Sequence, residues 1–412
     1  MSRFRPPLPR SGPAVLAPGR GGRRRPACHL VLLVGLAALG GSSVPAQQPV
    51  RLLLPDGPVE ARLAGWGEDG PLLADRETPP DWLGLELPPA GPQPPPAPAP
   101  WQLELNDGSW LPGSPGLGDG GTGSWRLPNG LSVDFDTLLL RRVGRSPGPF
   151  EAEDRDLLWL RSAAGGLDRL RGWLLDWRPA GLVFEGPAGE VEYPWDRIEA
   201  LEVVPEEPEP AGAGWVWLVL ADGGFLRCRP EPGGAEAALR VVLPGGGRLE
   251  VSWSSLRALH PIAGDGLVDA AWRVRERPDL RRLEPGPCLG RSVEGRPLRA
   301  GGREYPDGLG LRAPSILTRP LDRGGTFVAW AAIDQEAALC RAPQAFRFLV
   351  RFDGRELAVT PPLRAGDRPV LVRAELPGPG ELGLEVRPEG PLPFGGHADW
   401  LLPRLLAPPA GS

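Results

Sequence analysis

The sequence contains no lysine, so all 46 of its basic residues are arginine. Histidine, cysteine and methionine are also scarce, at three, four and one residues, whereas glycine and proline number 58 and 55. The exclusive use of arginine is typical of a GC-rich genome and by itself indicates no function. So much glycine and proline indicates low-complexity stretches between packed domains, and a chain of 412 residues has room for two or three domains.

The few histidines and cysteines argue against a metal centre. A zinc site takes three or four ligands. His260 and His397 are distant in the sequence, and Cys228, Cys288 and Cys340 show no C-x-x-C spacing. We therefore predict neither a metal site nor a cofactor, and we expect His260 to be structural or exposed rather than a catalytic base. Cys288 and Cys340 either form a disulfide, which export would permit, or are buried thiols.

The motifs of common catalytic sites are absent as well. The sequence has no G-x-S-x-G nucleophile elbow, no P-loop and no dinucleotide-binding fingerprint. The chain is therefore predicted to be non-catalytic. One enzymatic alternative stays open, a pair of glycosidase carboxylates within residues 101–262, because a sequence does not give the distance between two carboxylates.

Negative charge exceeds positive charge once the N-terminus is set aside. The formal net charge is −5, and the first 46 residues hold seven arginines and no acid. The rest of the chain therefore carries 39 arginines against 51 acidic residues. Such a surface repels phosphate backbones, and no basic stripe with interleaved aromatic residues interrupts it. We expect no nucleic-acid partner.

Residues 1–46 have the three parts of a secretory signal. Three arginines at 23–25 precede a short apolar run at 30–39, and the small residues at 44–46 resemble a cleavage site. An apolar run of about ten residues is too short to span a bilayer. We predict export to the periplasm, the cell surface or the medium, with no transmembrane span after removal of the signal. The alternatives are an uncleaved N-terminal anchor and a true start further downstream.

Short apolar runs followed by an Asp-Gly pair recur along the chain. The pairs are Asp56-Gly57, Asp107-Gly108, Asp222-Gly223 and Asp353-Gly354. An Asp-Gly pair after such a run is typical of a β-hairpin, because a type I′ turn needs positive φ at both central positions. We therefore predict a mainly β protein.

The region 101–263 contains an internal repeat of about sixty residues. Each unit ends with an aromatic residue (Phe135, Trp195 or Trp253) that is followed three residues later by an aliphatic one. These aromatics are 60 and 58 residues apart. Each unit is predicted to hold a few strands and a short helical turn, and is loosely similar to a small Sm-like barrel. Chance similarity among hairpins is the alternative.

Proline-rich breaks divide the chain into segments. Eight prolines among residues 87–100 prevent a β-ladder and favour an extended linker. The predicted segments are a short β unit at 47–86, this linker, the repeat region at 101–263, a connector at 264–282 with a short helix around 270–278, and a β-sandwich at 283–408.

The last third of the chain holds five distinctive segments. They are 301–315 with a tyrosine and a Gly-Leu-Gly sequence, 327–334 ending in Ile-Asp, 346–354 ending in Asp-Gly, the leucine-rich 382–386, and His-Ala-Asp-Trp at 397–400. In this order they resemble the NPCBM family of carbohydrate-binding modules, which occur attached to glycoside hydrolases such as those of family 98. The resemblance covers the C-terminal third only.

The resemblance implies a jelly-roll-like β-sandwich. The residues agree independently, since Phe346, Phe348 and Val350 alternate with their neighbours as in a strand with one buried face. The chain departs from the family at Arg312, where the family usually has histidine. Arginine is a fixed cation, so a ligand pocket shaped by that histidine would have altered or lost specificity. The alternative is that this segment is structural and tolerates arginine.

Sugar binding requires an aromatic plate for the apolar face of the ring and polar groups for its hydroxyls. The predicted carbohydrate-binding residues are Trp400, Asp399, His397, Arg312, Asp334 and Tyr305. The alternative is that Trp330 and Trp400 are core residues. We therefore predict an exported, non-catalytic accessory protein that binds a glycan or a cell-surface polysaccharide. The second interpretation is a structural or protein-interaction scaffold whose sandwich no longer binds sugar.

Overall fold

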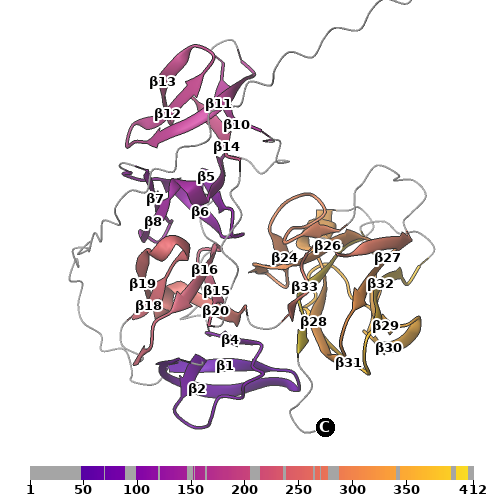
Figure 1. Ribbon diagram of the computed structural model, residues 1–412. Coiled ribbons are helices and arrows are strands. Elements are labelled where there is room, and N and C mark those ends of the chain that lie inside the picture. The colour runs from indigo at the N-terminus through magenta and orange to yellow at the C-terminus, as the bar shows by residue number, and fades with distance from the viewer. Residues whose placement is uncertain are drawn as a thin grey trace, which may run out of the picture. The chain divides into compact units, whose positions relative to one another are not determined.

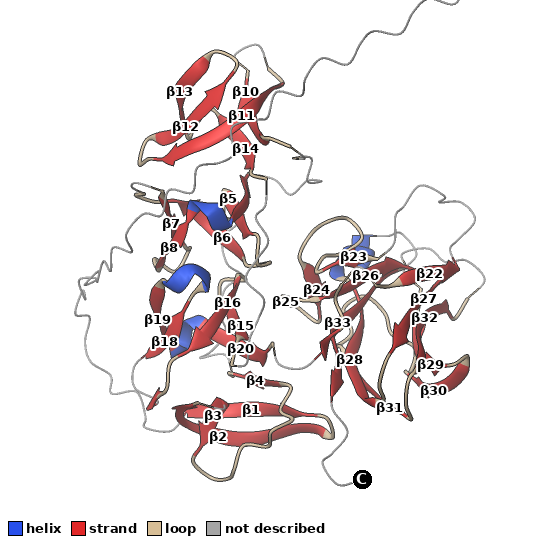
Figure 2. Ribbon diagram, viewed as in Figure 1, coloured by secondary structure: helices blue, strands red, loops and turns tan. Residues whose placement is uncertain are grey.

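The structure is a computed structural model. It describes residues 48–68, 70–88, 99–118, 121–145, 152, 154–162, 165–204, 214–234, 238–262, 265–269, 271–276, 287–339, 344–390 and 396–406. The predicted signal at 1–46, most of the predicted linker at 87–100, and Cys340 lie outside these residues. Strands dominate the described part (Figure 2), which confirms a mainly β protein. Its helices are short 3-10 turns: η1 (Thr137–Leu139), η2 (Pro244–Gly246), η3 (Trp253–Ser255) and η4 (Gln335–Leu339).

The first twenty strands are linked by hydrogen bonds into one continuous network. They are β1 (Gln48–Leu54), β2 (Gly57–Gly67), β3 (Gly70–Leu73), β4 (Gly84–Glu86), β5 (Trp101–Leu105), β6 (Trp110–Pro115), β7 (Thr122–Arg126), β8 (Ser132–Asp136), β9 (Leu140–Gly144), β10 (Asp156–Arg161), β11 (Leu167–Trp177), β12 (Gly181–Gly186), β13 (Gly189–Pro194), β14 (Ile198–Glu202), β15 (Val216–Leu220), β16 (Phe225–Pro230), β17 (Gly233–Gly234), β18 (Ala238–Val242), β19 (Arg248–Ser252) and β20 (Leu256–Pro261).

Three successive units of this region share one plan, in which the first strand pairs with the last. β5 pairs with β9, β10 with β14, and β15 with β20, all antiparallel. In the first and third units a 3-10 turn, η1 or η3, leads directly into the closing strand. The shorter segment β1–β4 is closed in the same way by pairing of β1 with β4. This shared plan of antiparallel hairpins agrees with the predicted β repeats.

The aromatic residue that marks each repeat lies where the chain turns into the closing strand. Phe135 is buried and packs edge-on against Trp177, with 5.5 Å between the ring centroids. Trp195 contacts the same Trp177 at 4.6 Å, and Trp253 is buried in the third unit. A ring at this turn contributes a large apolar area to the core, which explains why the position recurs while its neighbours change.

Strands also pair between units. β9 pairs with β14, β4 with β20, and β6 with β16. The second of these joints holds His260, whose Nδ1 lies 3.4 Å from the carbonyl oxygen of Leu83. Burial lowers the pKa of His260 to about 3, since a desolvated imidazole disfavours its charged form. His260 is therefore neutral and buried.

The remaining strands form two facing sheets and a small hairpin (Figure 1). One sheet has the order β23-β26-β33-β28-β31 with β21 paired to β33, the other the order β22-β27-β32-β29-β30, and β24 pairs with β25. The strands are β21 (Asp265–Gly266), β22 (Arg273–Glu276), β23 (Cys288–Leu289), β24 (Leu298–Ala300), β25 (Arg303–Tyr305), β26 (Gly308–Arg312), β27 (Ser315–Leu321), β28 (Gly325–Ile333), β29 (Phe346–Phe352), β30 (Arg355–Val359), β31 (Val370–Leu376), β32 (Gly380–Pro388) and β33 (His397–Leu406). This is the predicted β-sandwich.

The core of the sandwich lies between its two sheets. Phe346, Phe348 and Val350 are fully buried there, as their alternation predicts. The helix expected around 270–278 is a wrong prediction, because residues 273–276 form strand β22 and pair with β27. Trp272 is buried and Val274 packs against the same core, so alternate side chains of this segment face inward, as in a strand rather than a helix.

The predicted Asp-Gly hairpins are all present, as the pairs β1–β2, β5–β6, β15–β16 and β29–β30. Their turn types vary. Asp353 and Gly354 both have positive φ, 47° and 79°, as a type I′ turn requires. At Asp107-Gly108 only the glycine has positive φ, 90°. The N–H of Gly108 donates to the carbonyl oxygen of Leu105 at 3.1 Å, which is a type I turn ending in glycine.

Candidate functional site

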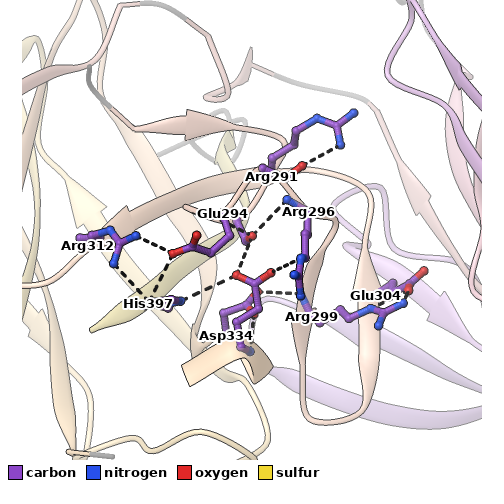
Figure 3. Close-up of polar contacts among 11 residues, drawn as sticks. Arg291, Glu294, Arg296, Arg299, Glu304, Arg312, Asp334 and His397 are labelled. Atoms are coloured by element: carbon purple, nitrogen blue, oxygen red, sulfur yellow. Dashed lines mark hydrogen bonds and ion pairs between the residues drawn. The ribbon is translucent and has the colours of Figure 1, made fainter. Parts of the chain in front are cut away.

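A group of polar side chains gathers where β26 ends and β33 begins (Figure 3). Arg312 is the last residue of β26, His397 is the first of β33, and the two are paired across the strands. Two further segments reach this edge, the turn at 292–296 between β23 and β24 and the short helix η4 after β28. We call Arg312, His397, Glu294, Glu336 and Arg296 the polar cluster.

Glu294 lies between the two basic side chains of the polar cluster. Arg312 donates from Nη2 to Glu294 Oε1, and Nη1 of Arg312 lies 3.4 Å from His397 Nε2. The same Nε2 lies 3.8 Å from Glu294 Oε1, so Glu294 is close to both basic side chains. The side chains of Arg312, His397 and Glu294 are 21, 12 and 44% exposed. The polar cluster is therefore open to solvent on its Glu294 side.

Glu336 is the most buried carboxylate of the polar cluster, with a side chain that is 10% exposed. It accepts a hydrogen bond from Ser292 Oγ at 3.0 Å, and it lies 3.5 Å from Arg296 Nε and 3.7 Å from His397 Nδ1. Burial raises the pKa of Glu336, and the Ser292 hydrogen bond acts in the opposite direction. Glu336 thus lies on the Nδ1 side of the histidine ring, whereas Arg312 lies on its Nε2 side.

The turn at 292–296 owes its shape to one buried serine. Ser292 Oγ accepts the backbone N–H groups of Glu294 and Arg296, both at 3.3 Å. Gly295 follows with φ of 76°, a conformation that costs glycine little. Glu294, Glu336 and Arg296 are missing from the sequence-based set of site residues. A Ser-x-Glu-Gly sequence is a turn signal, and it is the one local feature from which Glu294 was predictable.

Two of the predicted site residues are buried carboxyls beneath the polar cluster. Asp334 accepts backbone N–H groups from Glu336 at 2.8 Å and from Arg299 at 3.0 Å. Asp399 is equally buried. Its pKa is raised well above the ordinary value, chiefly by burial and further by the neighbouring carboxyls of Asp334 and Glu336. Neither residue reaches the surface where a ligand would bind.

Of the predicted aromatic residues, Trp400 lies in the core of the sandwich and the others lie outside that core. Trp400 is 0% exposed and packs between Phe348 and Phe327. Tyr305 and Trp330 are half-buried and pack against a small cluster that includes Leu298. In this structure Trp400 therefore presents no face to a sugar ring. Of the six predicted residues, Arg312 and His397 are the two brought together near the surface.

The polar cluster combines hydrogen-bond donors and acceptors at one edge of the sandwich. It offers arginine N–H donors and carboxylate acceptors side by side, and opposite charges lie within hydrogen-bond or ion-pair distance of each other. Such groups bind hydroxyls, which both donate and accept hydrogen bonds. Among the described residues, no group of three histidine, cysteine or acidic side chains is placed to hold a metal ion.

The comparisons relate the sandwich to a family of domains. Residues 285–406 match the NPCBM/NEW2 domain family, which confirms the resemblance predicted from the five sequence segments. This family consists of non-catalytic binding modules. The match covers strands β23 to β33 of the sandwich and does not extend to β21, β22 or the twenty-stranded region. The chain matches no curated protein.

Several solved structures resemble the chain at low identity. One is CBM51-2 in complex with GlcNAc, with INT domains, from Clostridium perfringens ZmpB, at 16% identity and a TM-score of 0.31, covering 48% of this chain and 39% of its own. A second is CBM51 from Clostridium perfringens GH95 in complex with methyl-galactose, at 20% identity and a TM-score of 0.27. The alignment covers 30% of this chain and 90% of that structure's chain. A third is the tandem CBM51 modules of Sp3GH98 from Streptococcus pneumoniae SP3-BS71, at 10% identity and a TM-score of 0.30. The alignment covers 61% of this chain and 88% of that structure's chain.

The described helices are all too short or too polar to cross a membrane.

Proposed function

We propose that residues 285–406 bind a glycan through the polar cluster, and that the whole chain is an exported, non-catalytic accessory protein. The observation that carries the proposal is the solvent-open group of Arg312, Glu294 and His397 within a segment that matches a carbohydrate-binding family. Export is proposed from the signal-like sequence at 1–46. The region 48–262 serves in this proposal as a scaffold.

The charges of the polar cluster favour a neutral sugar. Arg312 is paired with Glu294, and Arg296 with Glu336. An added sulfate or carboxylate on the ligand would have to displace one of these carboxylates to reach an arginine, whereas a hydroxyl fits between donor and acceptor without disturbing the pair. Hydrogen bonds to charged groups contribute about 1.5–3 kcal/mol each, so a few such contacts suffice for weak, selective binding.

A glycan-array screen of the full chain tests the proposal, with GlcNAc and galactose glycosides among the first probes. The informative variant is Arg312→Ala, which removes the donors while leaving the strand ladder in place. We expect it to lower affinity at least tenfold, because the lost hydrogen bonds involve a charged group. The matched control is Arg347→Ala, which removes another partly exposed, ion-paired arginine, on β29 of the other sheet. We expect its affinity to equal that of the wild type.

Two outcomes would contradict this site. If Arg312→Ala binds as tightly as the wild type, the sugar binds elsewhere. If the folded wild type binds no glycan at all, the second candidate function gains support, namely a structural or interaction protein whose sandwich no longer binds sugar. The burial of Trp400 favours that alternative, since it leaves this ring unavailable as an aromatic plate.

A further inference from the structure

The ladder between β28 and β33 places two buried carboxyls on one face. Ile333 pairs with Ala398, and the N–H of Asp334 donates to the carbonyl oxygen of His397 at 2.9 Å. Asp334 therefore lies opposite His397. Asp399 is two residues beyond His397 and so shares its face of the sheet. Asp334 and Asp399 are thus diagonal cross-strand neighbours, within reach of one another.

The hydrogen-bond partners of the two carboxyls differ. The oxygens of Asp334 receive the backbone N–H groups of Glu336 and Arg299. Within the described part of the chain, neither oxygen of Asp399 receives a hydrogen bond from an N–H or O–H group, and the residue is only 1% exposed. A buried, ionised carboxylate without a donor is strongly disfavoured. A proton on Asp399 removes this charge and provides an O–H group that can donate to a neighbouring acceptor.

The charges around Asp399 also favour the protonated form. The groups that face it from each neighbouring element are Asp334 at the end of β28, Glu336 on η4, His397 on its own strand, and the uncharged partners Ala332 on β28 and Gly310 on β26. His397 lies 3.4 Å from Arg312 Nη1 and 3.7 Å from Glu336 Oε2. Arg299 contributes its backbone N–H here, while its guanidinium pairs with Glu304. The nearest charges are therefore carboxylates.

We propose that Asp399 and Asp334 share one proton, carried by Asp399 and donated to Asp334, and that this pair positions the polar cluster. Because Asp399 carries the proton, the two oxygens of Asp334 can accept the backbone N–H groups of Glu336 and Arg299. Through these bonds the pair fixes η4, which carries Glu336, and β24, which follows the turn that carries Glu294 and Arg296. Asp334 and Asp399 are therefore positioning residues rather than sugar ligands. The inference concerns the fold and does not depend on glycan binding.

A shared proton makes the stability of the sandwich depend on pH in a defined direction. The pKa of Asp399 is raised in the native state, first by burial and then by Asp334 and Glu336. In the unfolded chain the carboxyl loses its proton near its ordinary pKa of about 3.9. The contribution of the pair is therefore complete below about pH 4, and it declines as the pH rises toward the native pKa of Asp399.

The test is Asp399→Asn in the full chain. The amide N–H₂ of asparagine donates to Asp334 at every pH, so the variant has no proton to lose. Protection factors for hydrogen exchange in β28 and β33 report opening of the sandwich, and comparison of the two proteins cancels the pH dependence of all other groups. Above about pH 4 the wild-type opening constant should rise relative to that of Asp399→Asn by about tenfold per pH unit, until the native pKa is reached.

The control is Glu356→Gln, which neutralises an exposed carboxylate on β30 of the opposite sheet. Its opening constant should follow that of the wild type at every pH. A second measurement is made on the wild type itself: above about pH 5, where exposed carboxyls have lost their protons, infrared spectroscopy should show the carbonyl band of a protonated carboxylic acid. Asp399→Asn should weaken that band. A pH-independent ratio between the wild type and Asp399→Asn, or a wild-type spectrum without that band, would overturn the proposal.

Discussion

Replacing Trp400 by alanine separates a core role from a ligand-binding role for this ring. Trp400 is fully buried, and its ring centroid lies 5.2 Å from that of Phe348 and 6.2 Å from that of Phe327, both in edge-to-face contact. Truncating a buried tryptophan to alanine costs about 3–5 kcal/mol. The two aromatic contacts favour the upper end of that range. This is a large share of the stability of a typical domain, about 5–15 kcal/mol.

Trp400→Phe refines the prediction. Phenylalanine keeps an aromatic ring in the core but loses the larger ring's volume. It also removes Nε1, a buried N–H that has no hydrogen-bond partner in the described structure. Leaving such a donor unpaired costs about 1–3 kcal/mol, so its removal offsets part of the lost packing. We expect Trp400→Phe to destabilise the sandwich by less than half as much as Trp400→Ala.

Denaturant titration followed by near-UV circular dichroism measures both free energies, and glycan binding is measured on the same samples under native conditions. The reasoning requires that any loss of binding by Trp400→Ala accompany a loss of stability. It is refuted if the free energy of unfolding of Trp400→Ala lies within about 1 kcal/mol of the wild-type value, because truncating a fully packed tryptophan costs more than that. An equally stable variant that no longer binds sugar would instead make Trp400 a ligand residue.

Three further predictions concern other parts of the chain. Gly310→Ala should destabilise the sandwich by about 1–3 kcal/mol in a thermal or denaturant titration, because a Cβ there would overlap the backbone carbonyl of Arg291. Cys228 should not react with a thiol reagent in the native state and should react fully after unfolding, because it is buried and burial raises its pKa. Ser109→Ala should cost about 1–3 kcal/mol, because the buried Ser109 Oγ donates to Asp107 at 3.1 Å.

Local signals in the sequence predicted much of the fold. Asp-Gly pairs identified hairpins because glycine permits the positive φ that tight turns need. The recurrent aromatic at Phe135, Trp195 and Trp253 identified the repeats because each one fills the same turn before a closing strand. The turn type itself was not predictable, since only Asp353 adopts positive φ among the four aspartates. Register and bulges decide that choice, and they depend on the partner strand.

The candidate site was predicted only in part. Arg312 and His397 were identified through the sequence segments that resemble the NPCBM family, and they meet because β26 and β33 are adjacent. Glu294 and Glu336 were missed because they come from a turn and a 3-10 helix, whose approach to this edge is set by tertiary structure. A sequence also does not show whether a tryptophan is buried or exposed. The burial of Trp400 follows from the packing of the two sheets and was therefore not predictable.

The pairing of β4 with β20 has a consequence for how the chain is made. β4 belongs to the first segment of the twenty-stranded region, whereas β20 ends its last unit, so the two ends of this region complete one another. During synthesis β4 emerges long before its partner, and until then one of its edges has no neighbour. An open strand edge is prone to pair with other chains. Contacts between residues so distant in sequence also form slowly. Until β20 pairs with β4, a nascent or truncated chain can therefore pair wrongly with another chain through the open edge of β4.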